Sequence, residues 1–186
     1  MEGMTSLVFA APAEDGRDGH AAQRLYHRAV RAGFMYRLAA RLRRTPCGLR
    51  DLAEIEQSGR VRARHALGLR SVEIARIGGS EGRTGEFDAR FYPRNERTAS
   101  RWQSVATARY RDLALPPVEL ILVEDTYYVR DGHHRVSVAV ARGEWYIEAR
   151  VTLWELSPLP APGLPSLVTA PPCPDPGLPA VPCPSA

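Results

Sequence analysis

The chain contains no lysine: all 25 of its basic residues are arginines, against 21 acidic residues, for a formal charge of +4. This absence excludes the phosphate-binding loop of the G-x-x-x-x-G-K-[ST] type, a lysine Schiff base and the nucleotide-binding lysine of protein kinases. Arginine cannot replace lysine in those roles, because its guanidinium does not give up its proton. A phosphate site in this protein must therefore be built without lysine.

Cysteine and long apolar runs are also scarce. The 186 residues include three cysteines (Cys47, Cys173 and Cys183), which are too few for a disulfide framework and indicate a reducing compartment. No apolar run approaches the ~18 residues that a membrane-spanning helix requires. The N-terminus has Glu2 where a secretion signal has positive charge. We therefore expect a cytoplasmic protein without a membrane partner, whose residues 1–20 are disordered.

Proline is concentrated at one end of the chain. Eleven of the 16 prolines lie between Pro158 and Pro184, a stretch with one charged residue, Asp175, and no aromatic residue. Such a composition offers no apolar period to bury, so we expect residues 157–186 to form a disordered tail. The rest of the chain is long enough to bury roughly two-thirds of its unfolded surface.

Residues 21–44 have the composition of a helix and hold seven arginines without any acidic residue. Three of these arginines recur at i, i+4 and i+7 and form one face. The same line continues through apolar residues, so that the whole line reads Arg24, Arg28, Arg31, Met35, Leu38 and Leu42. The apolar stripe thus changes sides at Gly33. Either Gly33 breaks the helix, or one helix touches different neighbours with its two halves.

Two interpretations of the arginines between Arg24 and Arg44 are open. They could make weak, non-specific contacts with DNA phosphates, or they could be a solvated face of an arginine-rich protein, which is the commoner situation. Together with a short helix expected from Leu49 to Ile55 and closed at residues 58–59, they define an arginine-rich helical extension over residues 21–70.

Residues 71–156 have the pattern of a separate α/β domain. Alternation from Val72 to Ile77 predicts a strand, and the four glycines within residues 78–85 predict a loop whose backbone can approach a ligand. A helix is expected over residues 98–113, with Trp102 in the core in preference to a base-stacking role. The double proline at residues 116–117 ends this helix.

The C-terminal half of this domain shows the clearest pattern. A hairpin is expected from strands at residues 118–123 and 127–130, followed by a helix at 135–142 and a last strand at 146–151. We expect a right-handed crossover that makes the last strand parallel to the second hairpin strand. The fold class is therefore α/β (α+β) with a small mixed sheet.

The loop Asp131-Gly132-His133-His134-Arg135 lies where a strand passes into a helix. The first turn of a helix has unpaired backbone N–H groups and a partial positive charge, and Gly132 allows close backbone approach. Arg135 can hold a phosphate through two parallel hydrogen bonds, and His133 and His134 add donors. This combination predicts a phosphate-binding site.

The segment from Arg130 to Ala139 resembles the second conserved box of the ParB-like superfamily, which includes the ParB N-terminal domain and the sulfiredoxins. Chromosome-partition proteins have a G-E-R-R form at this place, sulfiredoxins a G-C-H-R form, and ParB-like free-serine kinases the D-G-H-H-R form found in this chain. The resemblance covers about residues 71–151. It implies a ParB/sulfiredoxin-like fold in which Asp131–Arg135 bind the phosphates of a nucleotide (ATP, ADP or CTP) with Mg²⁺.

The resemblance also separates the activities within the superfamily. The sulfiredoxin cysteine would align with His133, so sulfiredoxin activity is excluded. The partition-protein motif and its helix-turn-helix reader are missing, which argues against clamp behaviour on DNA. In the serine kinases a glutamate after the first strand is the catalytic base, and Glu81 is the matching candidate here. Arg83, in the same loop, is a candidate second anion contact.

Two other interpretations of the loop stay open. Asp131, His133 and His134 could hold a metal ion, although adjacent side chains on a turn diverge and no further ligand cluster is visible, so we expect no metal site. The loop could also be a capped turn in which Asp131 bonds backbone amides. The functional hypotheses are therefore nucleotide binding, phosphoryl transfer to a small hydroxyl substrate with Glu81 as base, and weak DNA binding.

Overall fold

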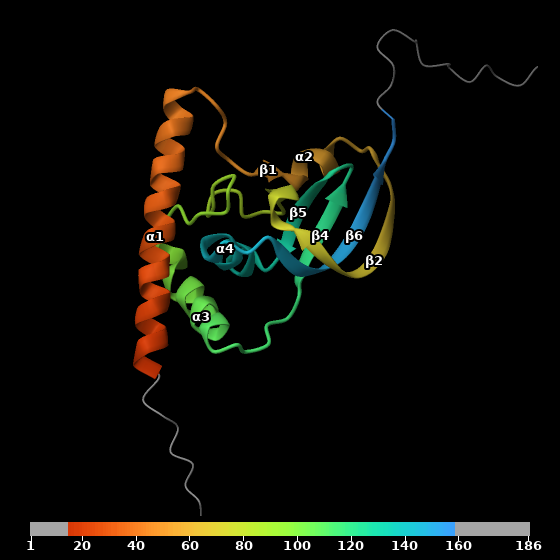
Figure 1. The fold of residues 1–186 in the computed structure, drawn as a ribbon. Helices are drawn as coiled ribbons and strands as arrows, with labels where there is room; N and C mark the ends of the chain where they lie inside the picture. The colour runs from red at the N-terminus through yellow and green to blue at the C-terminus, as the bar shows by residue number, and fades with distance from the viewer. Residues whose placement is uncertain (1–14, 159–186) are drawn as a thin grey trace, which may run out of the picture.

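A six-stranded mixed sheet with the order β1-β3-β5-β4-β6-β2 forms the centre of the computed structural model, which describes residues 15–158 (Figure 1). Its strands are β1 (Arg50–Asp51), β2 (Val61–Glu73), β3 (Ile77–Ser80), β4 (Val118–Val123), β5 (Thr126–Asp131) and β6 (Tyr146–Leu156). The helices are α1 (Asp15–Leu42), α2 (Leu52–Gln57), α3 (Ala99–Tyr110) and α4 (His133–Arg142), with 3₁₀ turns at Ile74–Arg76 and Glu96–Thr98. The expected mixed α/β class is confirmed.

The two faces of the sheet bury separate clusters of apolar residues. Along β4, Val118 and Leu120 face a large cluster that includes Trp102 of α3, whereas Ile121 and Val123 belong to a smaller cluster with α2. This division follows from the alternation of side chains along a strand. Helices α3 and α4 lie between the sheet and α1 (Figure 1). The expected core position of Trp102 is confirmed, since it is fully buried.

The direction of the last strand differs from the prediction. β6 pairs in parallel with β4, and β4 is antiparallel to β5, so β6 runs opposite to the second hairpin strand. The reason lies in the short connection between β5 and β6. Helix α4 begins beside the first residues of β4, and the chain after α4 is still at this end of the sheet, so β6 starts there and runs in the same direction as β4. The rule for right-handed crossovers applies to parallel strands and therefore does not apply to this connection.

The structure also moves two expected boundaries. Residues 15–20, expected to be disordered, form the first turns of α1, where Asp18 pairs with Arg111 at 3.3 Å. Residues 61–70, expected to be helical, belong to β2, which is hydrogen-bonded to β6 along its length. Residues before 15 and after 158, including most of the expected tail, lie outside the described part of the chain. No helix within residues 15–158 is long and apolar enough to cross a membrane.

Helix α1 runs without a break through Gly33, and this settles the first question raised by its sequence. Its inner side is one continuous stripe of buried residues with helical spacing: Ala22, Leu25, Tyr26, Ala29, Gly33 and Ala40. Gly33 allows the helix to approach residues 88–92 closely. A Cβ atom at this position would lie 2.7 Å from Cβ of Tyr92 and 3.2 Å from Oδ2 of the buried Asp88.

This contact gives a stability prediction. We expect Gly33→Ala to lower the free energy of unfolding by about 1–3 kcal/mol, because the added methyl group overpacks the contact with Tyr92. The matched control is Gly19→Ala in the same helix, where an added Cβ meets nothing within 4 Å. The free energy of unfolding of the control should rise by up to about 1 kcal/mol, because alanine has a higher helix propensity than glycine. Urea unfolding followed by circular dichroism measures the free energy of unfolding of both variants. An equal increase in Gly33→Ala and Gly19→Ala would contradict the close approach of Gly33 to Tyr92.

Candidate functional site

The turn between β5 and α4 depends on Gly132. Its backbone is left-handed, with φ of 93° and ψ of 23°. A Cβ atom there would lie 2.6 Å from Cγ1 of Val118 and 3.0 Å from the guanidinium of Arg135. Both the backbone conformation and the lack of space therefore require glycine.

The first turn of α4 begins directly after this glycine. The amide of Val136 donates to the carbonyl of Gly132 at 3.0 Å and starts the helical hydrogen bonding. The amides of His133, His134 and Arg135 have no acceptor within the helix, and no side chain caps this end. The helix dipole adds a partial positive charge at the same place.

His133 is buried at the start of α4, with 4% of its surface exposed. Its Nε2 lies 2.7 Å from Oγ of the fully buried Ser80, and its ring stacks on Phe87. Burial lowers the pKa of His133 to about 4, and the positive charge of Arg83 acts in the same direction. The imidazole is therefore neutral at pH 7.

The partners of Ser80 favour one tautomer of His133. The amide of Arg83 donates to Oγ of Ser80 at 3.3 Å. Nε2 of His133 is the other group within hydrogen-bond distance of this buried hydroxyl among the described residues. We infer that the His133 proton is on Nδ1, because Nε2 then accepts the hydroxyl hydrogen.

His134 is also buried, with its ring edge-on to Phe87. Burial lowers its pKa; Arg101 and Arg83 lower it further, and Glu86 opposes them. Its Nδ1 is buried and has no hydrogen-bond partner within residues 15–158. A buried polar atom without a partner is costly, so this nitrogen is an unsatisfied polar group at the start of α4.

Arg135 is already bonded within the protein. Its guanidinium donates to the carbonyl oxygens of Pro116 and Pro117 and to Oδ2 of Asp131, the last at 2.5 Å. Asp131 thus accepts a hydrogen bond from the side chain of Arg135. The capped-turn interpretation expected it to accept from backbone amides instead. Arg135 fixes the 116–117 segment against α4, and its contact with phosphate stays a prediction.

A cavity of about 320 Å³ opens at the N-terminal end of α4. Its lining includes the whole predicted loop, Asp131 to Arg135, and two arginines that come from other elements, Arg83 and Arg101. A neighbouring cavity of about 670 Å³ shares Arg83, Arg101 and His134 and adds Arg97. The structure thus brings Arg83 to the loop, and its contact with an anion stays a prediction.

The sequence did not point to three residues that the structure places at or beside the loop: Arg101, Ser80 and Phe87. Arg101 is exposed on the first turn of α3, with no ion pair or side-chain hydrogen bond within residues 15–158. Its position directly before the buried Trp102 was the available signal, because neighbouring residues on a helix point in different directions. Ser80 lies in the predicted glycine-rich segment and could have been noted as its only hydroxyl besides Thr84.

Glu81 is not brought to the cavity. Its carboxylate pairs with Nε of Arg130 at 2.9 Å, and it does not line either cavity at the end of α4. Its amide donates to the carbonyl of Val129 and extends the pairing of β3 with β5. The residue predicted as catalytic base therefore lies beside the site in a surface ion pair.

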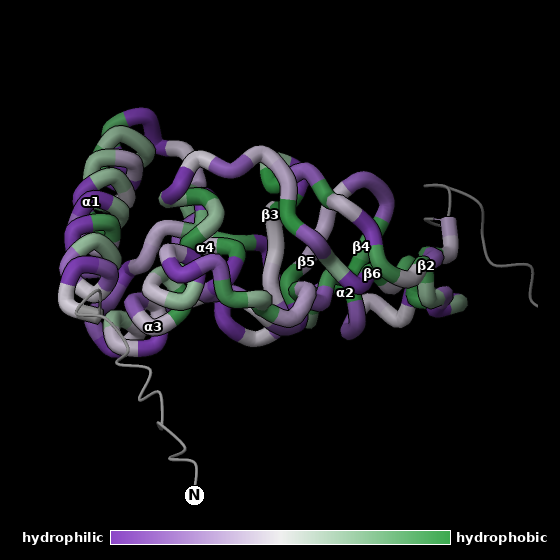
Figure 2. Tube along the Cα trace, turned by 60° about the horizontal axis from the view of Figure 1, so that its bottom comes forward, coloured by the Kyte–Doolittle hydropathy of each residue, from purple (hydrophilic) through white to green (hydrophobic). Residues whose placement is uncertain are grey.

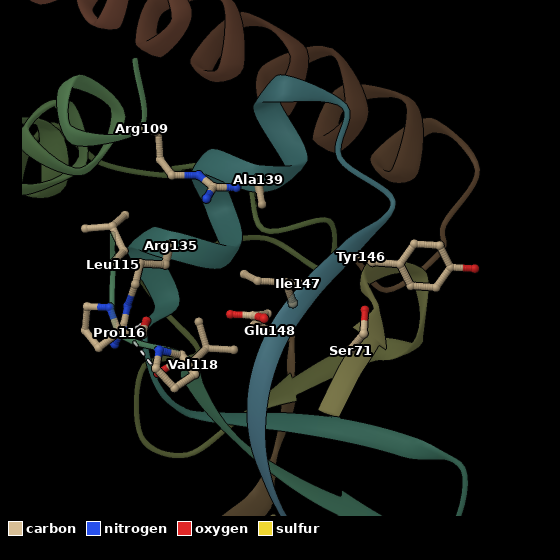
Figure 3. A pocket seen from close by; sticks show the side chains of 11 residues that line it. Ser71, Arg109, Leu115, Pro116, Val118, Arg135, Ala139, Tyr146, Ile147 and Glu148 are labelled. Carbon is tan, nitrogen blue, oxygen red and sulfur yellow. Dashed lines mark hydrogen bonds between the residues drawn. The ribbon is translucent and has the colours of Figure 1, made fainter. Parts of the chain in front are cut away.

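A third cavity, of about 240 Å³, lies on the other side of Arg135 (Figure 3). Arg109 of α3, Glu148 of β6 and Ser71 of β2 line it, and Arg135 reaches into it from α4 (Figure 3). Arg109 is paired with Glu144 at 2.5 Å. Since both arginines are occupied by protein partners, this cavity has less free positive charge than the one at the helix end.

Comparisons with known proteins give one structural similarity. No family model matches the chain, and no curated protein matches its sequence. Sulfiredoxin from Arabidopsis thaliana is similar in structure, with 19% sequence identity and a TM-score of 0.31. The similarity covers 45% of this chain and 82% of the sulfiredoxin chain. It concerns the arrangement of the backbone and assigns no activity.

The buried histidine gives a prediction for pH dependence. Between about pH 6.5 and pH 4 the unfolded chain binds a proton at His133 that the folded protein does not, so stability falls as the pH decreases. A shift from 6.5 to about 4 corresponds to a loss on the order of 3 kcal/mol across this window.

Urea unfolding at several pH values tests this. We expect His133→Asn to be less stable than wild type at pH 7 and to lose less stability between pH 6.5 and 4. His20→Asn, at an exposed position of α1, is the control and should follow the wild-type profile. An unchanged pH profile in His133→Asn would show that His133 is not the group responsible.

Proposed function

We propose that this protein binds a phosphate-bearing ligand, with a nucleotide as the expected class, at the N-terminal end of α4. The observation that supports this most directly is the cavity in which the first-turn amides of α4 lie beside two arginines from other elements, Arg83 and Arg101. Backbone amides at a helix start and arginine side chains are a common combination for phosphate binding in proteins.

The charge balance of the cavity favours an anion. Its lining has three arginines and one acidic residue, Asp131, whose carboxylate is bonded to Arg135. Arg83 has an ion pair with Glu86 at 3.5 Å, a length that leaves its guanidinium available to a stronger acceptor. Neutral His133 and His134 add no charge, but each imidazole can donate one N–H.

The ligand class comes from the sequence resemblance. The D-G-H-H-R form implies nucleotide phosphates, and the adjoining cavity of about 670 Å³ has room beside Arg97 and Arg101 for further parts of such a ligand. Within residues 15–158 no three His, Cys, Asp or Glu side chains gather to hold a metal ion. We propose that Mg²⁺ joins the site through the ligand's phosphate oxygens, which is usual for this ion.

Removal of one arginine tests the binding proposal. We expect Arg101→Ala to weaken binding of the best ligand about tenfold, which is ~1.4 kcal/mol, because one charge-assisted contact is lost. Calorimetric titration with phosphate, pyrophosphate, ATP, ADP and CTP, with and without Mg²⁺, measures this and identifies the ligand.

The matched control is Arg62→Ala, which removes the same charge from an exposed position on β2. It should bind within twofold of wild type. The proposal fails when none of the five anions binds wild type at millimolar concentration, or when Arg62→Ala weakens binding as much as Arg101→Ala does.

Glu81 distinguishes binding from phosphoryl transfer. Because its carboxylate pairs with Arg130 and does not line the cavity, we expect Glu81→Gln to bind the ligand within twofold of wild type. Transfer of phosphate from ATP to free serine is measured in the same samples. Wild-type turnover that falls at least a hundredfold in Glu81→Gln, about the size of a general-base effect, would establish the kinase alternative.

A further inference from the structure

The outward side of α1 has a row of exposed side chains that changes in character along the helix. Its first part is cationic and its second part is apolar; we call the whole line the outer face, formed by Arg24, Arg28, Arg31, Phe34, Met35, Leu38 and Leu42. The apolar part is unusually exposed, at 59% for Phe34, 61% for Met35, 42% for Leu38 and 78% for Leu42. Figure 2 shows hydrophobic segments continuing to the C-terminal end of α1.

Every residue of this face is exposed within the part of the chain that the structure describes. The buried side of α1 is the opposite stripe, from Ala22 to Ala40, which packs toward α3, α4 and residues 88–92. Among the arginines of the outer face, Arg28 makes one hydrogen bond, to the carbonyl of Ala141 at 3.3 Å. The sequence left open that the two halves of α1 touch different neighbours, and the inner stripe does so: its first part contacts α3 and α4, and from Gly33 on it approaches residues 88–92.

We propose that the outer face of α1 binds an amphipathic helix of another protein, with acidic residues opposite Arg24–Arg31 and apolar residues opposite Phe34–Leu42. Residues 21–44 contain seven arginines and no acid, so acidic side chains of a partner would complement the charge of this face. From Arg24 to Leu42 the face is about 27 Å long, and apolar side chains at three- and four-residue spacing fit the grooves of a second helix.

A second copy of this chain does not fit the face. A parallel pairing would place Arg24–Arg31 of one copy against the same arginines of the other. An antiparallel pairing would place these arginines against the apolar residues Phe34–Leu42, and no acid in residues 21–44 would compensate the charge. The parallel pairing juxtaposes like charges, and the antiparallel pairing desolvates arginine without an acidic partner. Both effects disfavour association of two copies.

The arrangement also disfavours a membrane surface and a DNA duplex. A helix that lies in a membrane interface has its apolar residues along the whole length and its cations at the sides. In α1 the cations occupy the same line as the apolar residues. A duplex would neutralise Arg24, Arg28 and Arg31 but would place Met35, Leu38 and Leu42 against a phosphate backbone.

Selection from a displayed library tests the proposal. A library of random 25-residue peptides on bacterial cells is sorted against the wild-type protein and counter-sorted against the double variant Met35→Ser/Leu42→Ser. We expect enriched peptides with apolar residues at helical spacing in one half and Asp or Glu in the other. A synthetic enriched peptide, followed by fluorescence anisotropy, should lose at least tenfold affinity for the double variants Met35→Ser/Leu42→Ser and Arg24→Gln/Arg31→Gln.

Leu69→Ser is the matched control, since Leu69 is 63% exposed on β2, away from α1. It should bind the peptide within twofold of wild type. All substituted side chains are exposed, so thermal melts should show unchanged folds. Absence of enrichment, or enrichment without acidic residues, overturns the proposal. So does binding through the same residues to phosphatidylserine vesicles, to a DNA duplex or, in sedimentation velocity, to a second copy.

Discussion

The steric constraint at Gly132 determines the geometry of the candidate site. Because Val118 occupies the space that a side chain would need, β5 can pass into α4 only through a glycine with a left-handed backbone. This turn places the start of α4 against the start of β4. It thereby positions the free amides of the first helical turn, buries His133 beneath them and lets Arg135 reach the 116–117 segment. Loss of the turn would move all of these groups together.

Much of this arrangement could be predicted because its signals are local in the sequence. The apolar spacing around Trp102 defines α3, and the hairpin turn at Glu124 separates two strands; α3 itself ends at Tyr110, before the prolines at 116–117 that were expected to end it. The glycine at 132 between a strand and a helix indicated an anion-binding turn, and the structure places the loop at the mouth of a cavity. Each of these features is determined by residues a few positions apart.

The features that could not be predicted depend on residues far apart in the chain. Ser80 and His133 are 53 residues apart, and their hydrogen bond requires the parallel pairing of β3 with β5. Arg101 reaches the site because α3 packs beside α4, and the direction of β6 depends on its choice of β4 as a neighbour. The neutral state of His133 follows from the same packing, since burial and not the sequence motif lowers its pKa.

The two edges of the sheet restrict how this protein can associate with others. One edge is β1, which has only two residues. The other edge is β2, which carries Arg62, Arg64 and Arg70. The pairing of β2 with β6 is irregular near Gly68, whose backbone is left-handed. Short, charged and irregular edge strands do not accept an additional strand well. Growth of the sheet by strand addition, and the aggregation that follows from it, are therefore hindered at both ends of the strand order.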